Sequence, residues 1–72
     1  MNDMIDQIDD RRFKIFDEIG YKPEPCHNWL LENYVMDEDY TYEYTGSSLH
    51  VHETTVTFHS MDTAVAFKLR WL

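Results

Sequence analysis

The alternation of residues 40–45, Tyr-Thr-Tyr-Glu-Tyr-Thr, constrains the fold of this chain more than any other feature. A period of two places the three tyrosines on one face of a β-strand and the threonines and the glutamate on the other. Gly46, Ser47 and Ser48 then have the composition of a turn, and residues 49–59 that of a return strand. The sequence therefore predicts an antiparallel hairpin.

The apolar parity changes within the return strand. Leu49 and Val51 are odd-numbered, whereas Val56 and Phe58 are even-numbered. Such a change requires a β-bulge or a second turn at residues 53–55. We favour the second turn, which makes the sheet a three-stranded meander.

A helix is predicted over residues 60–72. Ser60 suits the N-cap, Asp62 suits the positive end of the helix dipole, and Lys68 and Arg70 suit the negative end. The side chains that share one face of this helix are Ala64, Phe67 and Trp71.

The N-terminal residues have the period of an amphipathic helix. Spacings of three, four and seven relate the apolar residues Met4, Ile5, Ile8, Ile15 and Ile19, and Phe13 and Phe16 widen this stripe. Asn2 or Asp3 suits the helix start, and Gly20 suits its end. An acidic ridge is expected on the opposite side of the helix, formed by Asp3, Asp6, Asp10 and Asp17.

A second helix is predicted over residues 26–35, after Pro23 and Pro25, with Trp29 and Leu30 as its apolar anchor. The expected fold is a single α+β domain over residues 1–72. It has two N-terminal helices, an antiparallel two- or three-stranded sheet, and a C-terminal helix packed on one face of that sheet. One cysteine permits no internal disulfide, and there is no signal peptide or long apolar run, so we expect a cytoplasmic protein.

The negative charge is concentrated in one half of the chain. Residues 1–39 hold eleven acidic and four basic residues, a balance of −7, whereas residues 40–72 have a balance of −1. This charge repels nucleic acids and membrane surfaces and favours a basic protein partner.

The C-terminal segment TVTFHSMDTAVAFKLRWL resembles the C-terminus of many small proteins encoded by tailed bacteriophages. The resemblance covers about a quarter of the chain. It implies a strand that joins a small sheet and a helix that packs back on that sheet. It also implies a viral accessory protein, a class that includes small acidic inhibitors of host defence, anti-CRISPR proteins and DNA mimics. It implies no catalytic residue.

Three other groups of residues bear on function. His50 and His52 share a strand face and, with His59, Cys26 and His27, suit a metal site, although their spacing matches no established zinc pattern and two surface histidines are favoured. Cys26 beside His27 is favoured as a small buried residue over a nucleophile. The tyrosine strand is interpreted first as a core face and second as a protein-binding face.

The expected function is that of a non-enzymatic, phage-encoded inhibitor that binds a basic surface of a host protein, as an anti-CRISPR protein or DNA mimic does. The alternatives are a structural protein that forms homodimers and a small metal-binding module. We expect no cofactor and no direct contact with nucleic acid or membrane. The candidate partner-binding residues are Asp6, Asp9, Asp10, Asp17, Asp37, Glu38, Asp39, Tyr40, Tyr42 and Trp29.

Overall fold

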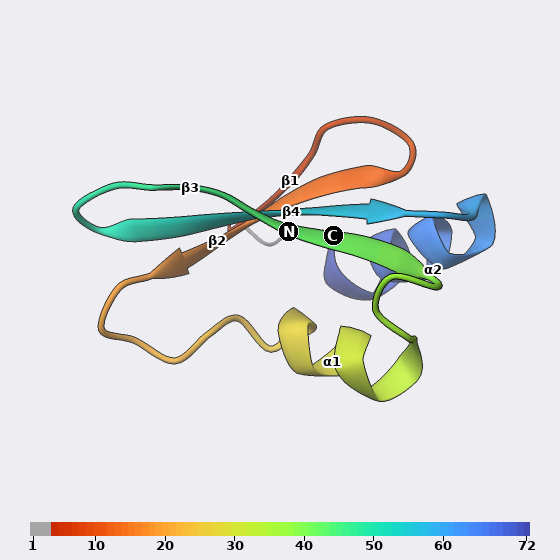
Figure 1. Ribbon diagram of the computed structural model, residues 1–72, viewed down its shortest axis with the longest axis horizontal. Coiled ribbons are helices and arrows are strands. Elements are labelled where there is room, and N and C mark those ends of the chain that lie inside the picture. The colour runs from red at the N-terminus through yellow and green to blue at the C-terminus, as the bar shows by residue number, and fades with distance from the viewer. Residues whose placement is uncertain (1–3) are drawn as a thin grey trace.

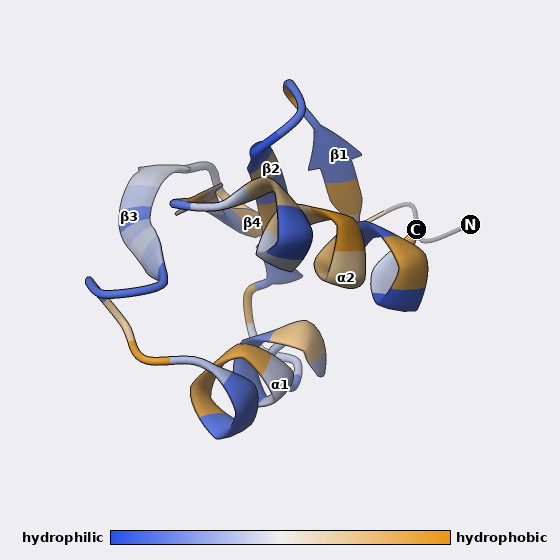
Figure 2. Cartoon of the chain, turned by 90° about the vertical axis from the view of Figure 1, so that its right-hand side faces the viewer, coloured by the Kyte–Doolittle hydropathy of each residue, from blue (hydrophilic) through white to orange (hydrophobic). Residues whose placement is uncertain are grey.

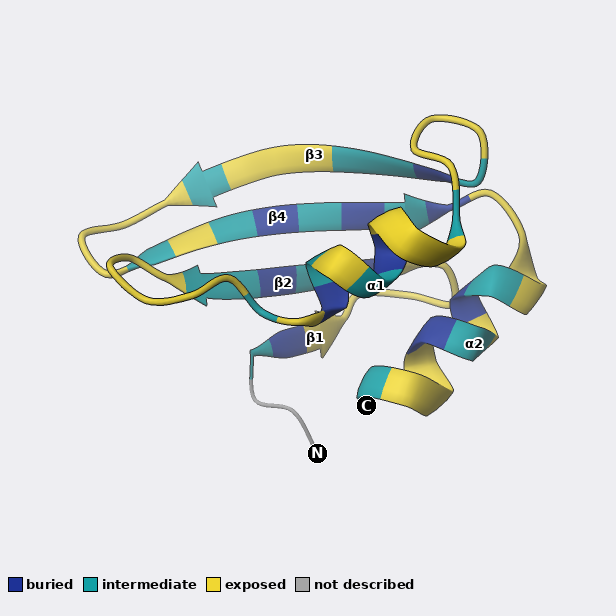
Figure 3. Ribbon diagram, turned by 90° about the horizontal axis from the view of Figure 1, so that it is seen from below, coloured by how far each residue is buried: buried dark blue, intermediate teal, exposed yellow. Residues whose placement is uncertain are grey.

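The computed structural model describes residues 4–72, which form one four-stranded antiparallel sheet and two helices. In chain order the elements are β1 (Ile5–Gln7), β2 (Arg12–Glu18), α1 (Cys26–Asn33), β3 (Tyr40–Ser47), β4 (Val51–Phe58) and α2 (Met61–Trp71). The strand order is β1-β2-β4-β3. Both helices lie on the same face of the sheet (Figures 1 and 3). The fold is α+β, but its arrangement differs from the predicted one.

The prediction of two N-terminal helices is wrong, because the first predicted helix is the β1–β2 hairpin. Ile8 and Ile19, which the helical stripe required to be buried, are about two-fifths exposed. Phe13 and Ile15 are fully buried instead, two residues apart on β2. All seven residues of β2 pair with β4, so long-range pairing overrides the helical spacing.

The hairpin of β3 and β4 is confirmed, but the predicted second turn at residues 53–55 is wrong. Those residues lie inside the continuous strand β4, and the irregularity is a bulge in β3 between Tyr44 and Gly46. Leu49 lies in the turn and is almost fully exposed, so its parity reported nothing about a strand face. The additional strands come from the N-terminal segment instead.

The core lies between the sheet and the two helices. The face of the sheet that the helices cover supplies Ile5, Phe13, Ile15, Tyr40, Val56 and Phe58; α1 supplies Cys26 and Leu30, and α2 supplies Ala64 and Phe67. The ring of Phe67 lies 4.9 Å from that of Phe13 and 5.2 Å from that of Phe58, centroid to centroid. Aromatic contacts of this kind join α2 to the middle of the sheet.

The helix predicted at the C-terminus is confirmed as α2. The Ser60 hydroxyl accepts a hydrogen bond from the Thr63 backbone N–H at 3.3 Å, as expected of an N-cap. The helix predicted over residues 26–35 is present as α1, which ends two residues earlier and has no side-chain cap at its start. Contacts with the sheet therefore decide where α1 lies.

Candidate functional site

Two loops that carry acidic residues meet the first turn of α2, which contains Asp62, at one end of the sheet. The Phe58 N–H donates to the Arg11 carbonyl at 2.8 Å, and the His59 N–H donates to the Asp39 carbonyl at 3.0 Å. These bonds place the β1–β2 loop and the α1–β3 loop on either side of the end of β4, where α2 begins. We call this region the acidic end; its carboxylates are Asp9, Asp10, Asp37, Glu38, Asp39 and Asp62.

The α1–β3 loop holds its acidic residues in a defined turn. The Asp39 carboxylate accepts the Val35 N–H at 2.7 Å, and Asp37, with a φ of 71°, donates its own N–H to the Tyr40 carbonyl at 2.7 Å. The His59 ring donates from Nδ1 to the Glu38 carbonyl at 2.8 Å. The run of residues 37–39 is therefore part of a hydrogen-bonded turn.

In the β1–β2 loop the two aspartates differ. The Asp9 carboxylate accepts the backbone N–H groups of Arg11 and Arg12 and forms an ion pair with the Arg12 guanidinium at 2.6 Å. The hydrogen bond from Arg11, followed by that from the Arg12 side chain, lowers the pKa of Asp9. Asp9 thus closes the turn, while the neighbouring Asp10 is exposed to solvent. The acidic end contains six acidic residues and two basic residues, Arg11 and Arg12, so its charge balance is −4.

The predicted helical ridge does not form in the described part of the chain, because Asp6, Asp10 and Asp17 lie on a hairpin. Asp6 is exposed on β1, opposite Lys14 of β2, and Asp17 lies near the other end of β2. Asp3 lies outside the described residues. The tertiary structure therefore separates Asp6 and Asp17 from the acidic end and joins Asp9 and Asp10 to residues 37–39.

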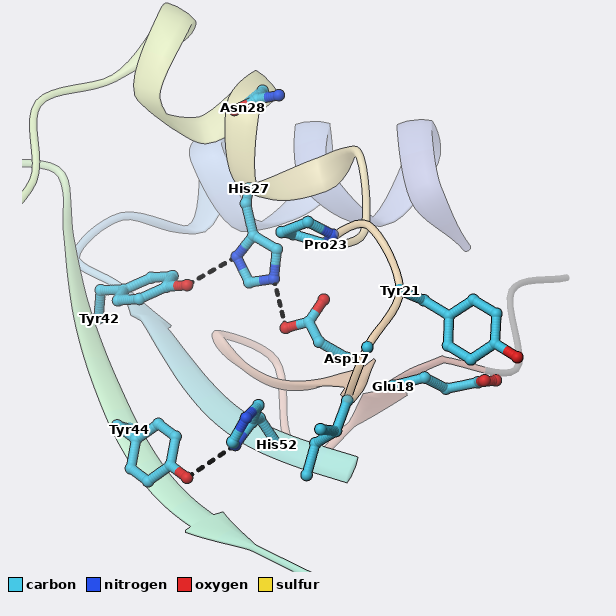
Figure 4. A pocket seen from close by; sticks show the side chains of 11 residues that line it. Asp17, Glu18, Tyr21, Pro23, His27, Asn28, Tyr42, Tyr44 and His52 are labelled. Carbon is cyan, nitrogen blue, oxygen red and sulfur yellow. Dashed lines mark hydrogen bonds and ion pairs between the residues drawn. The ribbon is translucent and has the colours of Figure 1, made fainter. Parts of the chain in front are cut away.

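Asp17 belongs to a hydrogen-bonded chain with His27 and Tyr42, shown in Figure 4. The His27 Nε2 atom donates to the Asp17 Oδ2 atom at 2.7 Å, because a carboxylate only accepts. In the neutral ring, the Nδ1 atom then accepts the Tyr42 hydroxyl at 2.7 Å. The other Asp17 oxygen accepts the Glu24 N–H at 2.8 Å. The chain joins β2, α1 and β3.

A shallow cavity of about 540 Å³ lies against this chain. On β3 the Tyr44 hydroxyl lies 2.9 Å from Nδ1 of His52, so two tyrosine–histidine pairs line the cavity (Figure 4). Burial raises the pKa of Tyr42, and its phenol stays protonated at neutral pH. Every polar side-chain atom of Asp17, His27 and Tyr42 has a partner, so the arrangement fixes α1 against the sheet and leaves no free general base among these three residues.

The aromatic residues predicted as anchors lie in or against the core. Tyr40 is fully buried, so its ring does not project from the surface. Tyr42 is half-buried and bonded to His27. Trp29 is half-buried, with its ring 5.5 Å from Tyr34 and 6.3 Å from Trp71. Trp29 and Tyr42 pack against the core cluster that contains Tyr40, and the role of the three residues as anchors stays a prediction.

The histidines and the cysteine are dispersed. Within residues 4–72 no three His, Cys, Asp or Glu side chains are grouped so as to hold a metal ion. Cys26 is buried, and burial, with smaller contributions from Asp17 and Glu24, raises the pKa of its thiol to about 12. A buried, protonated thiol is a poor nucleophile, which agrees with the interpretation of Cys26 as a small core residue.

Two residues of the acidic end were missed by the sequence reasoning, His59 and Asp62. His59 was considered only as a metal ligand, and Asp62 only as a helix-dipole partner. No sequence spacing relates either residue to Asp9 or Asp37, because the end of β4 brings them together.

Comparisons of the chain with protein-family models, with curated proteins and with solved structures found no match. Neither helix in the described part of the chain has the length and apolar character needed to cross a membrane. The functional conclusion therefore rests on the residues and their arrangement.

Proposed function

We propose that this protein is a non-enzymatic, phage-encoded inhibitor that acts in the host cytoplasm by binding a basic surface of a host protein through the acidic end. The observation that carries the proposal is the convergence of two acidic loops and the first turn of α2 at one end of the sheet, with the loops held there by hydrogen bonds. A loop whose backbone is already held in place loses little conformational entropy when a cationic surface docks on it.

The kind of partner follows from the charge. A balance of −4 at one end of a chain with a net charge of −8 attracts surfaces rich in lysine and arginine and repels nucleic acid. The basic nucleic-acid groove of a host defence nuclease, such as a CRISPR effector, is a surface of this type. Mimicry of DNA through carboxylates spaced along a helix is not part of the proposal, because the predicted helical ridge does not form.

The proposal is tested by affinity capture from a bacterial host lysate at about 50 mM and 500 mM salt, since the attraction between exposed charges is screened at the higher concentration. We expect capture of a basic protein at low salt, loss of that capture at high salt, and at least a tenfold loss with the double charge reversal Asp10→Lys and Glu38→Lys.

The matched control reverses Glu18→Lys and Glu43→Lys, which are exposed away from the acidic end and change the net charge equally. Equal losses in the two double variants would show that net charge, and not this surface, governs capture. Recovery of no basic protein at 50 mM salt would overturn the proposal.

A further inference from the structure

An exposed apolar patch lies directly beside the acidic turn. Leu31 on α1 and Val35 and Met36 in the connection to β3 are 60%, 55% and 42% exposed. The connection is visible as an orange, hydrophobic stretch between α1 and β3 in Figure 2, and the outward side of α1 is exposed in Figure 3. Large apolar side chains grouped at a surface mark an interaction site more often than isolated ones do.

Two residues of the patch line a small cavity of about 130 Å³. Leu31 and Met36 line it together with Tyr40, Tyr42 and His27, so its walls are almost entirely apolar. A protein cavity of about 150 Å³ accommodates benzene. The cavity beside α1 is therefore large enough for one aliphatic side chain.

The chain segments that form and flank the patch carry only acidic charged residues. Asp37, Glu38 and Asp39 follow Met36 directly, and the bond from the Val35 N–H to the Asp39 carboxylate fixes the acidic turn against the patch. Glu32 is exposed beside Leu31. No lysine or arginine occurs between residues 23 and 67. An occupant of complementary chemistry is apolar at its centre and cationic at its flanks.

We propose that the cavity lined by Leu31 and Met36, beside Val35, receives one aliphatic side chain from a partner segment in which lysines or arginines flank that side chain. This inference rests on the proposed function and adds an apolar contact to it. A second copy of this chain is a poor occupant, because two molecules with a net charge of −8 repel each other and the segments around the patch are acidic in both.

The test uses two synthetic peptides of equal charge, acetyl-KRLRK-amide and acetyl-KRSRK-amide, titrated into isotope-labelled protein at about 50 mM salt. We expect the leucine peptide to bind about tenfold more tightly than the serine peptide, the ratio for a side chain that loses roughly half of its contact with water. The methyl signals of Leu31, Val35 and Met36 should shift with the leucine peptide.

Matched variants separate the patch from general surface effects. Leu31→Ser, and independently Met36→Ser, should bring the affinity ratio of the two peptides close to one, and both positions are exposed enough to tolerate the change. Leu69→Ser is the control, since Leu69 is 81% exposed on α2 and lies outside the patch. This variant should keep the tenfold ratio.

Each remaining outcome overturns a defined part of the inference. Equal binding of both peptides, still weakened by Asp10→Lys and Glu38→Lys, would overturn the apolar site and leave the proposed function standing. Absence of binding by either peptide would overturn both. Methyl shifts that depend on protein concentration without peptide would assign the patch to a second copy of the chain instead.

Discussion

Carboxylates have opposite environments at the two ends of the sheet. At the acidic end, Asp10 and Glu38 are exposed, and no ion pair in the described part of the chain includes them. At the other end, the Asp17 carboxylate is only 14% exposed and is bonded to His27 and to the Glu24 N–H. A count of acidic residues therefore says little about function until the structure shows which carboxylates already have partners.

The largest expected effect comes from removing the imidazole at the Asp17 end. His27→Ala leaves the Asp17 Oδ2 atom and the Tyr42 hydroxyl without their partner, and we expect the free energy of unfolding to fall by about 2–3 kcal/mol. Urea denaturation measures the change. His50→Ala is the matched control, because His50 is an exposed histidine for which a change within about 0.5 kcal/mol is expected. Equal losses of stability in His27→Ala and His50→Ala would show that the bonds of His27 to Asp17 and Tyr42 do not stabilise the fold.

Alkaline pH is expected to lower the free energy of unfolding by a smaller amount, because Cys26 loses its proton more easily in the unfolded chain. The thiol pKa is about 12 in the folded protein and near its usual value of 9.0 in the unfolded chain. Above pH 9 the unfolded chain releases this proton while the folded chain keeps it, so stability is fully present below pH 9 and falls as the pH rises. Between pH 8 and pH 10 the loss from this group is about 1.4 kcal/mol.

The measurement is urea denaturation of the protein and of Cys26→Ala at both pH values. The variant should lose less stability than the wild-type protein between pH 8 and pH 10. Some loss should remain, because burial raises the pKa of Tyr40 and Tyr42 in the same direction. An identical loss in the two proteins would show that Cys26 does not keep its proton in the folded state.

The hydroxyl of Tyr42 is expected to contribute less to folding stability than the His27 imidazole does. Tyr42→Phe removes its bond to His27 and leaves the ring in place, which should lower the free energy of unfolding by about 1 kcal/mol. Tyr44→Phe removes an exposed bond to His52 and should cost less than half as much. Thermal unfolding of the two variants gives the comparison. A larger loss of stability for Tyr44→Phe would show that the bond between Tyr42 and His27 is not the more stabilising of the two.

The smallest effects are expected at the acidic end. Asp10→Asn and Glu38→Gln should change the free energy of unfolding by less than about 0.5 kcal/mol, with a slight increase because each removes repulsion between like charges. Asp17→Asn serves as the comparison and should be clearly destabilising. A loss above about 1 kcal/mol for Glu38→Gln would mean that this carboxylate has a structural role, and it would weaken the proposal that it is held for a partner.

Sequence reasoning succeeded where one local signal was sufficient. The Ser60 cap and the charges of α2 agree with the helical spacing of Ala64 and Phe67, so the helix is found in place. In β3 the alternation of Tyr40, Tyr42 and Tyr44 is unambiguous. The predicted function remains a proposal, and its acidic residues are distributed differently from the expected pattern.

The prediction from sequence was wrong where the helical period and the strand period both fitted the same residues. Ile5, Phe13 and Ile15 satisfy a helix by their spacings and a hairpin by their alternation, and only the seven-residue pairing of β2 with β4 decides between the two. A signal for the apolar patch was present in the adjacent Leu30 and Leu31, because one short helix face cannot bury both fully. Leu30 is buried and Leu31 is 60% exposed.

The sequence by itself determined the α+β class, the β3–β4 hairpin, the capped helix α2 and the excess of negative charge, because these depend on neighbouring residues or on composition. Only the tertiary structure decided that residues 5–7 and 12–18 form two strands, that Asp17 is enclosed with His27 and Tyr42, and that the loop with Asp9 and Asp10 lies at the same end of the sheet as residues 37–39. The reason is physical: pairing of distant strands and burial against distant side chains outweigh a local preference of a few tenths of a kcal/mol per residue.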